Sequence, residues 1–262
     1  MATKKSPKSD TPVSQAPAVV EVNGALVSAE EQAAWGASPF LSSRDTIIPK
    51  ILLMQPMSKK VLADEAAFGE LRDSVTNEVY GSDKKSIEII PFHLQTVWVE
   101  HEKNVDPKTG KEDLKYLRTV PLSPQNDTLP LDEPNLKRVR TMQFYVLRPE
   151  ELGSGIPKVI AFRITSIKAG KKLATQMYVT NRAAGLPPPG RVMRLSVSRQ
   201  TNGKGTFAVM DVEPVRAATS EERASALKWF KIIQTDAAVK VDDSDVAEVE
   251  TPVEDSGTTG QF

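Results

Sequence analysis

The sequence of 262 residues contains no cysteine and only two histidines, His93 and His101. The absence of cysteine excludes disulfides, thiolate metal sites and cysteine nucleophiles, and it agrees with a reducing cytoplasm. Two histidines on neighbouring predicted strands, without organised carboxylates, are more typical of structural histidines than of a metal site. We therefore expect no metal and no cofactor.

Signatures of membrane proteins and of several enzyme classes are also missing. No apolar run approaches the roughly 18 residues that a membrane span needs, and the basic N-terminus is not followed by the apolar stretch of a secretory signal. The sequence has no GxxxxGKS/T phosphate loop, no GxGxxG fingerprint and no GxSxG elbow. We expect a soluble cytoplasmic protein (host cytoplasm for a viral protein) that is not an enzyme.

The charge is balanced overall, with 34 basic and 34 acidic residues, but it is unevenly distributed. Residues 241–262 contain seven acids and no base, whereas residues 137–216 contain 15 bases against four acids. A basic body with an acidic tail indicates a polyanionic partner and a tail that competes with it. A solvated surface with a solubility tail explains the same pattern equally well.

Alternating apolar and polar residues predict a series of strands. The clearest strands cover residues 141–148, 158–165, 191–201 and 205–215, and Asn202-Gly203-Lys204 forms a hairpin turn between the last two. Further strands are predicted at 86–94 with a bulge at Pro91, at 95–101, and at 114–120 beyond a polar hairpin tip at 103–113. Near the start, Pro49 within an apolar stretch indicates an edge strand or an extended anchoring segment.

Two helices complete the expected domain. One covers residues 166–179, and the other covers 220–233 after a capping box formed by Thr219 and Glu222. Ala226, Phe230 and Ile233 share one face of the second helix, which we expect to pack on the sheet.

The order of these elements contains no βαβ repetition, which argues against a doubly wound parallel sheet. We expect a mainly β fold with minor α, namely an OB-like antiparallel barrel with insertions and a terminal helix. The predicted organisation is a disordered N-terminal arm at 1–43, an OB-like nucleic-acid-binding domain at 44–235 and a disordered acidic C-terminal tail at 236–262.

Single-strand binders combine cations that follow phosphates with flat side chains that stack on bases. The alternation places Met142, Phe144 and Val146 inward and Gln143 and Tyr145 outward. The same reasoning places Ile160, Phe162 and Ile164 inward with Arg163 outward, and Met193, Leu195 and Val197 inward with Arg194 outward. The candidate DNA-binding residues are Trp98, Arg140, Tyr145, Arg163, Lys171, Lys172, Arg191, Arg194, Arg199 and Lys204. For Trp98 and Tyr145, a packed structural position is an equally good interpretation.

The acidic stretch Asp242–Asp255 and the terminal Phe262 resemble the tails of the single-stranded DNA-binding proteins of bacteriophages and bacteria. Those proteins pair an OB barrel with a flexible acidic tail, which ends in phenylalanine in the bacterial members. The segment DTIIPKILLMQPMSKKV at 45–61 also resembles a stretch near the start of phage replication proteins. In this chain, residues 257–261 separate the acids from Phe262.

The resemblance implies a single-stranded DNA-binding protein that acts in phage DNA replication and recombination. It also implies a tail that recruits replication, recombination or transcription proteins and competes with DNA. The tail residues concerned are Asp242, Asp243, Asp245, Glu254, Asp255 and Phe262. Two alternatives remain open, a structural or assembly protein of a virion or complex, and a transcription or recombination accessory factor.

Overall fold

The computed structural model describes residues 19–22, 25–28, 47–105, 108–109, 112–152, 156–203, 205–235 and 240–241. The chain divides into two units, residues 1–42 and 43–262. The first unit contains one antiparallel pair, β1 (Val19–Val22) with β2 (Ala25–Ser28). The rest of the predicted N-terminal arm and nearly all of the predicted acidic tail lie outside the described residues.

The second unit is mainly β, as the sequence predicts. Its strands are β3 (Ile47–Ile48), β4 (Lys50–Leu53), β5 (Leu71–Asp73), β6 (Val79–Gly81), β7 (Ile87–Val105), β8 (Glu112–Pro121), β9 (Asp132–Glu133), β10 (Leu136–Leu147), β11 (Lys158–Phe162), β12 (Arg191–Asn202), β13 (Gly205–Ala217) and β14 (Lys240–Val241). The helices are α2 (Lys59–Leu62), α3 (Ile167–Thr175), the π-helical turn η3 (Gln176–Thr180), α4 (Asn181–Ala183) and α5 (Ser220–Thr235), and the 3₁₀ turns are η1 (Pro149–Glu151) and η2 (Ile164–Ser166).

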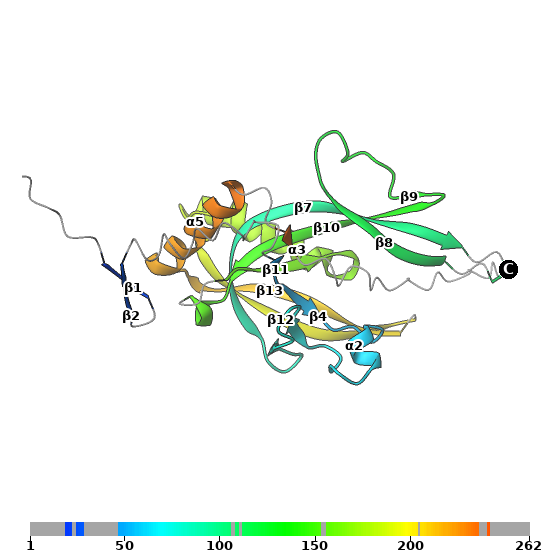
Figure 1. Ribbon diagram of the computed structural model, residues 1–262, viewed down its shortest axis with the longest axis horizontal. Coiled ribbons are helices and arrows are strands. Elements are labelled where there is room, and N and C mark those ends of the chain that lie inside the picture. The colour runs from blue at the N-terminus through cyan, green and yellow to red at the C-terminus, as the bar shows by residue number, and fades with distance from the viewer. Residues whose placement is uncertain are drawn as a thin grey trace, which may run out of the picture. The chain divides into compact units, whose positions relative to one another are not determined.

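Eight strands follow one another in the order β13-β12-β7-β10-β11-β4-β5-β6, with β8 added to β7 and β9 added to β10 (Figure 1). The pair of β11 with β4 is parallel, so the sheet is mixed. The sheet is not closed by strand pairing, and the predicted OB-like antiparallel barrel is therefore not shown. Instead, the side chain of Gln55 bonds to the edge strand β13: Nε2 donates to the Ala208 carbonyl at 2.8 Å, and Oε1 accepts from the Ala208 amide at 3.0 Å.

Strand β7 is the long spine of the sheet, and it merges two strands that the sequence predicts separately. Its first residues pair with β12, its last nine pair with β8, and β10 runs along its other edge. The predicted bulge is confirmed: Val146 pairs with Pro91 and Tyr145 with His93, which leaves Phe92 as the extra residue. The bulge lets Phe92 and His93 both approach the Tyr145 ring, with centroid distances of 6.4 and 5.4 Å.

The sheet is packed on both faces. The first core receives a buried side chain from every strand of the eight-strand path and from α3, and the inward positions predicted for Met142, Phe144 and Val146 are confirmed. The second core lies under α5 on the opposite face and includes Tyr145. The outward positions predicted for Tyr145 and Gln143 are wrong, because both side chains are buried. A central strand covered on both faces carries a continuous apolar run, here residues 144–147, rather than an alternating one.

Two further predictions fail where the chain changes direction. Strand β4 lies between β11 and β5, so the edge strand, one of the two alternatives inferred from Pro49, does not describe β4. Pro49 instead separates β3, which pairs with β14, from β4, and its carbonyl accepts from the Val159 amide at 2.9 Å. Strand β11 ends at Phe162, so Ile164 does not join the core and is 50 % exposed.

Both predicted helices are present. In the capping box of α5, the Thr219 amide donates to Glu222 Oε2 at 2.6 Å, and the Glu222 amide donates to Thr219 Oγ1 at 3.2 Å. Ala226, Phe230 and Ile233 belong to the second core, so the helix packs on the sheet as expected. The predicted helix at 166–179 corresponds to α3 and η3, which continue into α4.

A buried carboxylate connects β5 and β6 to β11. Asp73 is completely buried, and its Oδ2 accepts from Lys158 Nζ at 2.8 Å and from the Tyr80 hydroxyl at 2.7 Å. Its Oδ1 accepts from the amides of Val75 and Thr76, both at 2.8 Å. Burial raises the pKa of Asp73, but these hydrogen bonds outweigh burial and lower the pKa to about 2.

We predict that replacing Asp73 destabilises the fold strongly. Asp73→Asn leaves the Lys158 ammonium buried without its counter-charge, so the free energy of unfolding should fall by about 3 to 5 kcal/mol in urea titrations. The wild-type pair is fully stabilising above the unfolded-state pKa of Asp73, near 4, and this stabilisation is lost as pH falls through about 2.

The urea midpoint of the wild-type chain should therefore decline below about pH 4 more steeply than that of Asp73→Asn. Asp211→Asn, which removes an exposed ion pair with Lys172, is the control and should change stability by less than about 1 kcal/mol. Equal stability losses in the two variants would contradict the structural role assigned to Asp73.

Candidate nucleic-acid interface

The segment α3–η3–α4 is one helical stretch with a buried face against the first core. The buried positions are Ala169, Gly170, Leu173, Met177 and Asn181. A Cβ atom at Gly170 would lie only 2.7 Å from Phe162 Cβ and 3.3 Å from Met142 Sδ. The glycine therefore lets the helix approach the sheet more closely than a larger residue would allow.

The opposite face of this segment is basic and exposed. Lys168, Lys171, Lys172, Tyr178 and Arg182 follow one another at helical spacing, and we call these five residues the basic helix face. The Tyr178 side chain is 42 % exposed, which leaves part of its ring accessible. Burial of the remainder raises the pKa of Tyr178, while a hydrogen bond with the backbone of Leu94 acts in the opposite direction.

The charge of this face is only partly neutralised. Residues 152–210 contain ten lysines and arginines and no acidic residue. Lys172 pairs with Asp211 at 2.9 Å, and the charges of Lys172 and Lys168 both help to lower the pKa of Asp211 against the effect of burial. Within the described part of the chain, Lys171 and Arg182 have no acidic group within 4.0 Å. Both side chains are also exposed, so an external anion can reach them.

The structure places two of the predicted DNA-binding residues together on one helical surface and separates most of the others. Lys171 and Lys172 lie on the basic helix face, and Arg163 lies just before its start. By contrast, Arg194 pairs with Glu213 at 2.9 Å, and Arg199 pairs with Asp83 at 2.9 Å and lies 4.8 Å from the Phe68 ring centroid.

The remaining predicted cations do not extend the basic helix face. Arg140, on β10, pairs with Asp127 at 3.3 Å. Arg191 is half-buried, and its Nε atom is buried without a hydrogen-bond partner among the described residues. Lys204 lies outside the described residues, as do the tail residues from Asp242 to Phe262.

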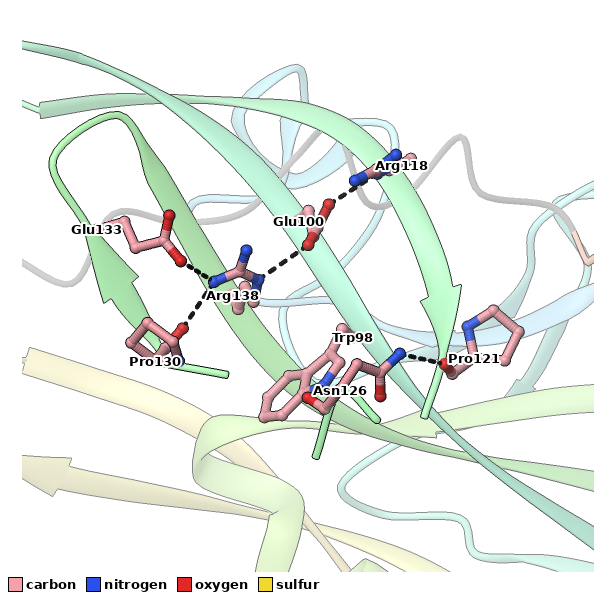
Figure 2. A network of polar contacts seen from close by, with 8 residues as sticks. All are labelled: Trp98, Glu100, Arg118, Pro121, Asn126, Pro130, Glu133 and Arg138. Carbon is pink, nitrogen blue, oxygen red and sulfur yellow. Dashed lines mark hydrogen bonds and ion pairs between the residues drawn. The ribbon is translucent and has the colours of Figure 1, made fainter. Parts of the chain in front are cut away.

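Trp98 and Tyr145, the predicted base-stacking residues, are both buried. Trp98 is 3 % exposed, and its indole Nε1 donates to the Asn126 carbonyl at 2.9 Å beneath the loop after β8 (Figure 2). Tyr145 is also 3 % exposed, and its hydroxyl donates to Gln95 Oε1 at 3.2 Å. The prediction that these rings stack on bases is corrected, because neither ring presents a face to solvent.

Figure 2 also shows that Arg138, within the basic run at 137–140, is paired with carboxylates. Glu100 is 3 % exposed and accepts from Arg118 Nε at 2.7 Å and from Arg138 Nε at 2.9 Å. Arg138 also bonds to Glu133 and to the Pro130 carbonyl. Burial raises the pKa of Glu100, but the hydrogen bonds and charges of the two arginines lower it. The network holds β7, β8 and β10 together and leaves little uncompensated charge.

Sequence reasoning missed Tyr178 because it searched the strands for aromatic residues. The signal was the recurrence of polar and cationic residues at 168, 171, 175, 178 and 182, one face of a helix. Among the described residues, no group of three or more histidine, aspartate or glutamate side chains is placed to hold a metal ion. The described helices also include none that is long and apolar enough to cross a membrane.

Comparison with known protein families shows which family the chain belongs to. The family model described as Pam3 phage gp34-like protein matches residues 21–239, which is more than half of the chain. The chain belongs to the Pam3 phage gp34-like family. The region shared with this phage family includes the basic helix face and ends before the acidic residues 242–255. No curated protein and no solved structure matches this family member.

We predict that the close contact of α3 with the sheet does not tolerate a larger residue. Gly170→Ala places a methyl group against the Phe162 side chain, so the free energy of unfolding should fall by about 1 to 3 kcal/mol. Lys171, the next residue along the helix, is exposed, so Lys171→Ala should change the free energy of unfolding by no more than about 0.5 kcal/mol. Thermal and urea unfolding measure both variants, and an unchanged stability of Gly170→Ala would contradict the packing described.

Proposed function

We propose that this chain is a phage single-stranded DNA-binding protein that contacts DNA through the basic helix face. In this proposal the protein is not an enzyme. It protects single strands during phage DNA replication and recombination, and it recruits partner proteins through its acidic tail. The observation that carries the proposal is the exposed set of Lys171, Arg182 and Tyr178 on one helical surface, within a stretch of chain that has no acid.

The chemistry of this face suits a single strand. Cations supply the salt-dependent attraction to phosphates, and an exposed aromatic ring supplies a stacking surface for a base. From Lys168 to Arg182 the helix rises about 21 Å at 1.5 Å per residue, which is enough to follow several consecutive nucleotides. The proposal does not require a closed OB-like barrel, because the interface lies on a helix that packs on the sheet.

In this proposal, the acidic tail competes with DNA for the basic helix face. Seven acids follow the last described strand, β14, whose Val241 packs against the second core. A tethered polyanion reaches a high effective concentration near a basic surface, so it competes with DNA without any external ligand. This arrangement would reserve the basic helix face for strands that bind more tightly than the tail.

We predict that neutralising the basic helix face weakens DNA binding without unfolding the chain. The combined substitutions Lys168→Ala, Lys171→Ala and Arg182→Ala should lower affinity for a fluorescein-labelled oligo-dT at least about tenfold at low salt. They should also reduce the slope of log affinity against log salt by up to about 2. Fluorescence anisotropy across a salt series measures both quantities.

A matched control removes the same charge elsewhere: Lys59→Ala, Lys84→Ala and Lys228→Ala, all exposed and outside the basic helix face. This variant should bind almost as tightly as the wild-type chain. Equal losses in the two triple variants would contradict the location of the interface. No binding by the wild-type chain at low salt would refute the proposed function and turn attention to a virion-assembly role.

We predict that removing the tail strengthens DNA binding. The deletion should begin after Val241 rather than before it, because β14 pairs with β3 and contributes to the second core. Deletion of residues 242–262 should raise oligo-dT affinity several-fold at low salt, with a smaller effect at high salt, since the tail competes electrostatically. A full-length variant with the seven acids changed to Asn or Gln is the control, and it should bind like the truncated chain.

A further inference from the structure

Ile164 has an unusual backbone conformation at the junction of β11 and α3. Its φ is +43°, in the left-handed region, and the other described non-glycine residues with positive φ are Asp64 and Asn77. Aspartate and asparagine tolerate this region, whereas a β-branched residue is strained there. The Ile164 side chain is also 50 % exposed, so it gains little from burial. Burial of Ile164 therefore offsets this strain only in part.

The turn that holds Ile164 is well fixed. Ser166 Oγ donates to the Arg163 carbonyl at 3.0 Å and accepts from the Arg163 amide at 3.0 Å, which closes the turn on both sides of Ile164. Phe162, immediately before the turn, is fully buried, and α3 begins at Ile167. The exposed isoleucine is therefore presented outward from a rigid base.

The chain on both sides of Ile164 is cationic. Arg163 precedes it, Lys168 follows four residues later, and residues 152–210 contain no acid. Asp211 of β13 also lies near this segment, where it pairs with Lys172 and interacts with Lys168. An apolar side chain between cations matches the chemistry of a nucleotide, which presents an apolar base face beside an anionic phosphate. Bases of a single strand expose these faces, whereas bases of a duplex are stacked on one another.

We infer that Ile164 is a base-contacting residue for single-stranded nucleic acid at the N-terminal end of the basic helix face. This inference rests on the proposed function and adds the residue that contacts an unstacked base. The strained backbone is maintained because it aims the side chain at the ligand. Glycine at this position would relieve the strain but remove the contact.

The test compares Ile164→Gly with the wild-type chain on two oligonucleotides, oligo-dT and an abasic oligomer of equal length and charge. Ile164→Gly should melt at the same or a higher temperature. It should bind oligo-dT about five- to tenfold more weakly, but bind the abasic oligomer as tightly as the wild-type chain does. A merely structural effect would weaken binding to both oligomers.

Two control variants separate the contributions. Asn77→Gly also removes a left-handed non-glycine residue, and Leu62→Ala removes an exposed apolar side chain, both away from α3. Neither should change the ratio of the two affinities. If the wild-type chain binds oligo-dT and the basic triple variant binds weakly, but Ile164→Gly keeps the wild-type ratio, the inference fails while the proposed function stands. Failure of the wild-type chain to bind either oligomer refutes both.

Discussion

The buried carboxylate of Asp73 is the constraint on which the position of the candidate interface depends. Four hydrogen bonds converge on it, and the strongest charge partner, Lys158, is the first residue of β11. Strand β11 leads directly into the turn at Arg163 and then into α3. A buried ion pair commonly adds little net stability relative to apolar packing, but it penalises any arrangement that separates its partners. The pair therefore specifies how the β5–β6 hairpin meets the strand that delivers the helix.

Close packing transmits this position to the surface. Phe162 ends β11 inside the first core, and Gly170 lies against its ring, so the helix axis is set by a contact that leaves no room for a methyl group. The buried face of the helix then determines which residues point outward. Lys171, Tyr178 and Arg182 are exposed together because Leu173, Met177 and Asn181 are buried on the other side. The basic helix face is thus a consequence of packing rather than of local charge alone.

Arginines elsewhere on the chain show that a basic sequence is not the same as a basic surface. Glu100 on β7 accepts hydrogen bonds from Arg118 on β8 and from Arg138 on β10, although it lies 38 positions before Arg138 in the chain. Arg194 and Arg199 likewise find Glu213 and Asp83 on neighbouring segments. Pairing across strands depends on register, which charge counts along the chain do not reveal. The cations of the helical segment lie in a stretch without acids, and two of them, Lys171 and Arg182, have no acidic partner within the described part of the chain.

The sequence by itself determined the features that depend on short-range pattern. These include the mainly β character, the bulge at Pro91, the capping box of α5 and the inward set of Met142, Phe144 and Val146, because each follows from residue spacing or local backbone chemistry. The tertiary structure decided the rest. Tyr145 is buried because α5 covers a second face of the sheet. Trp98 is buried because the loop after β8 closes over it. Strand β4 is internal because it pairs with both β11 and β5. These outcomes depend on contacts between segments far apart in the chain, and such contacts leave no periodic signal in either partner.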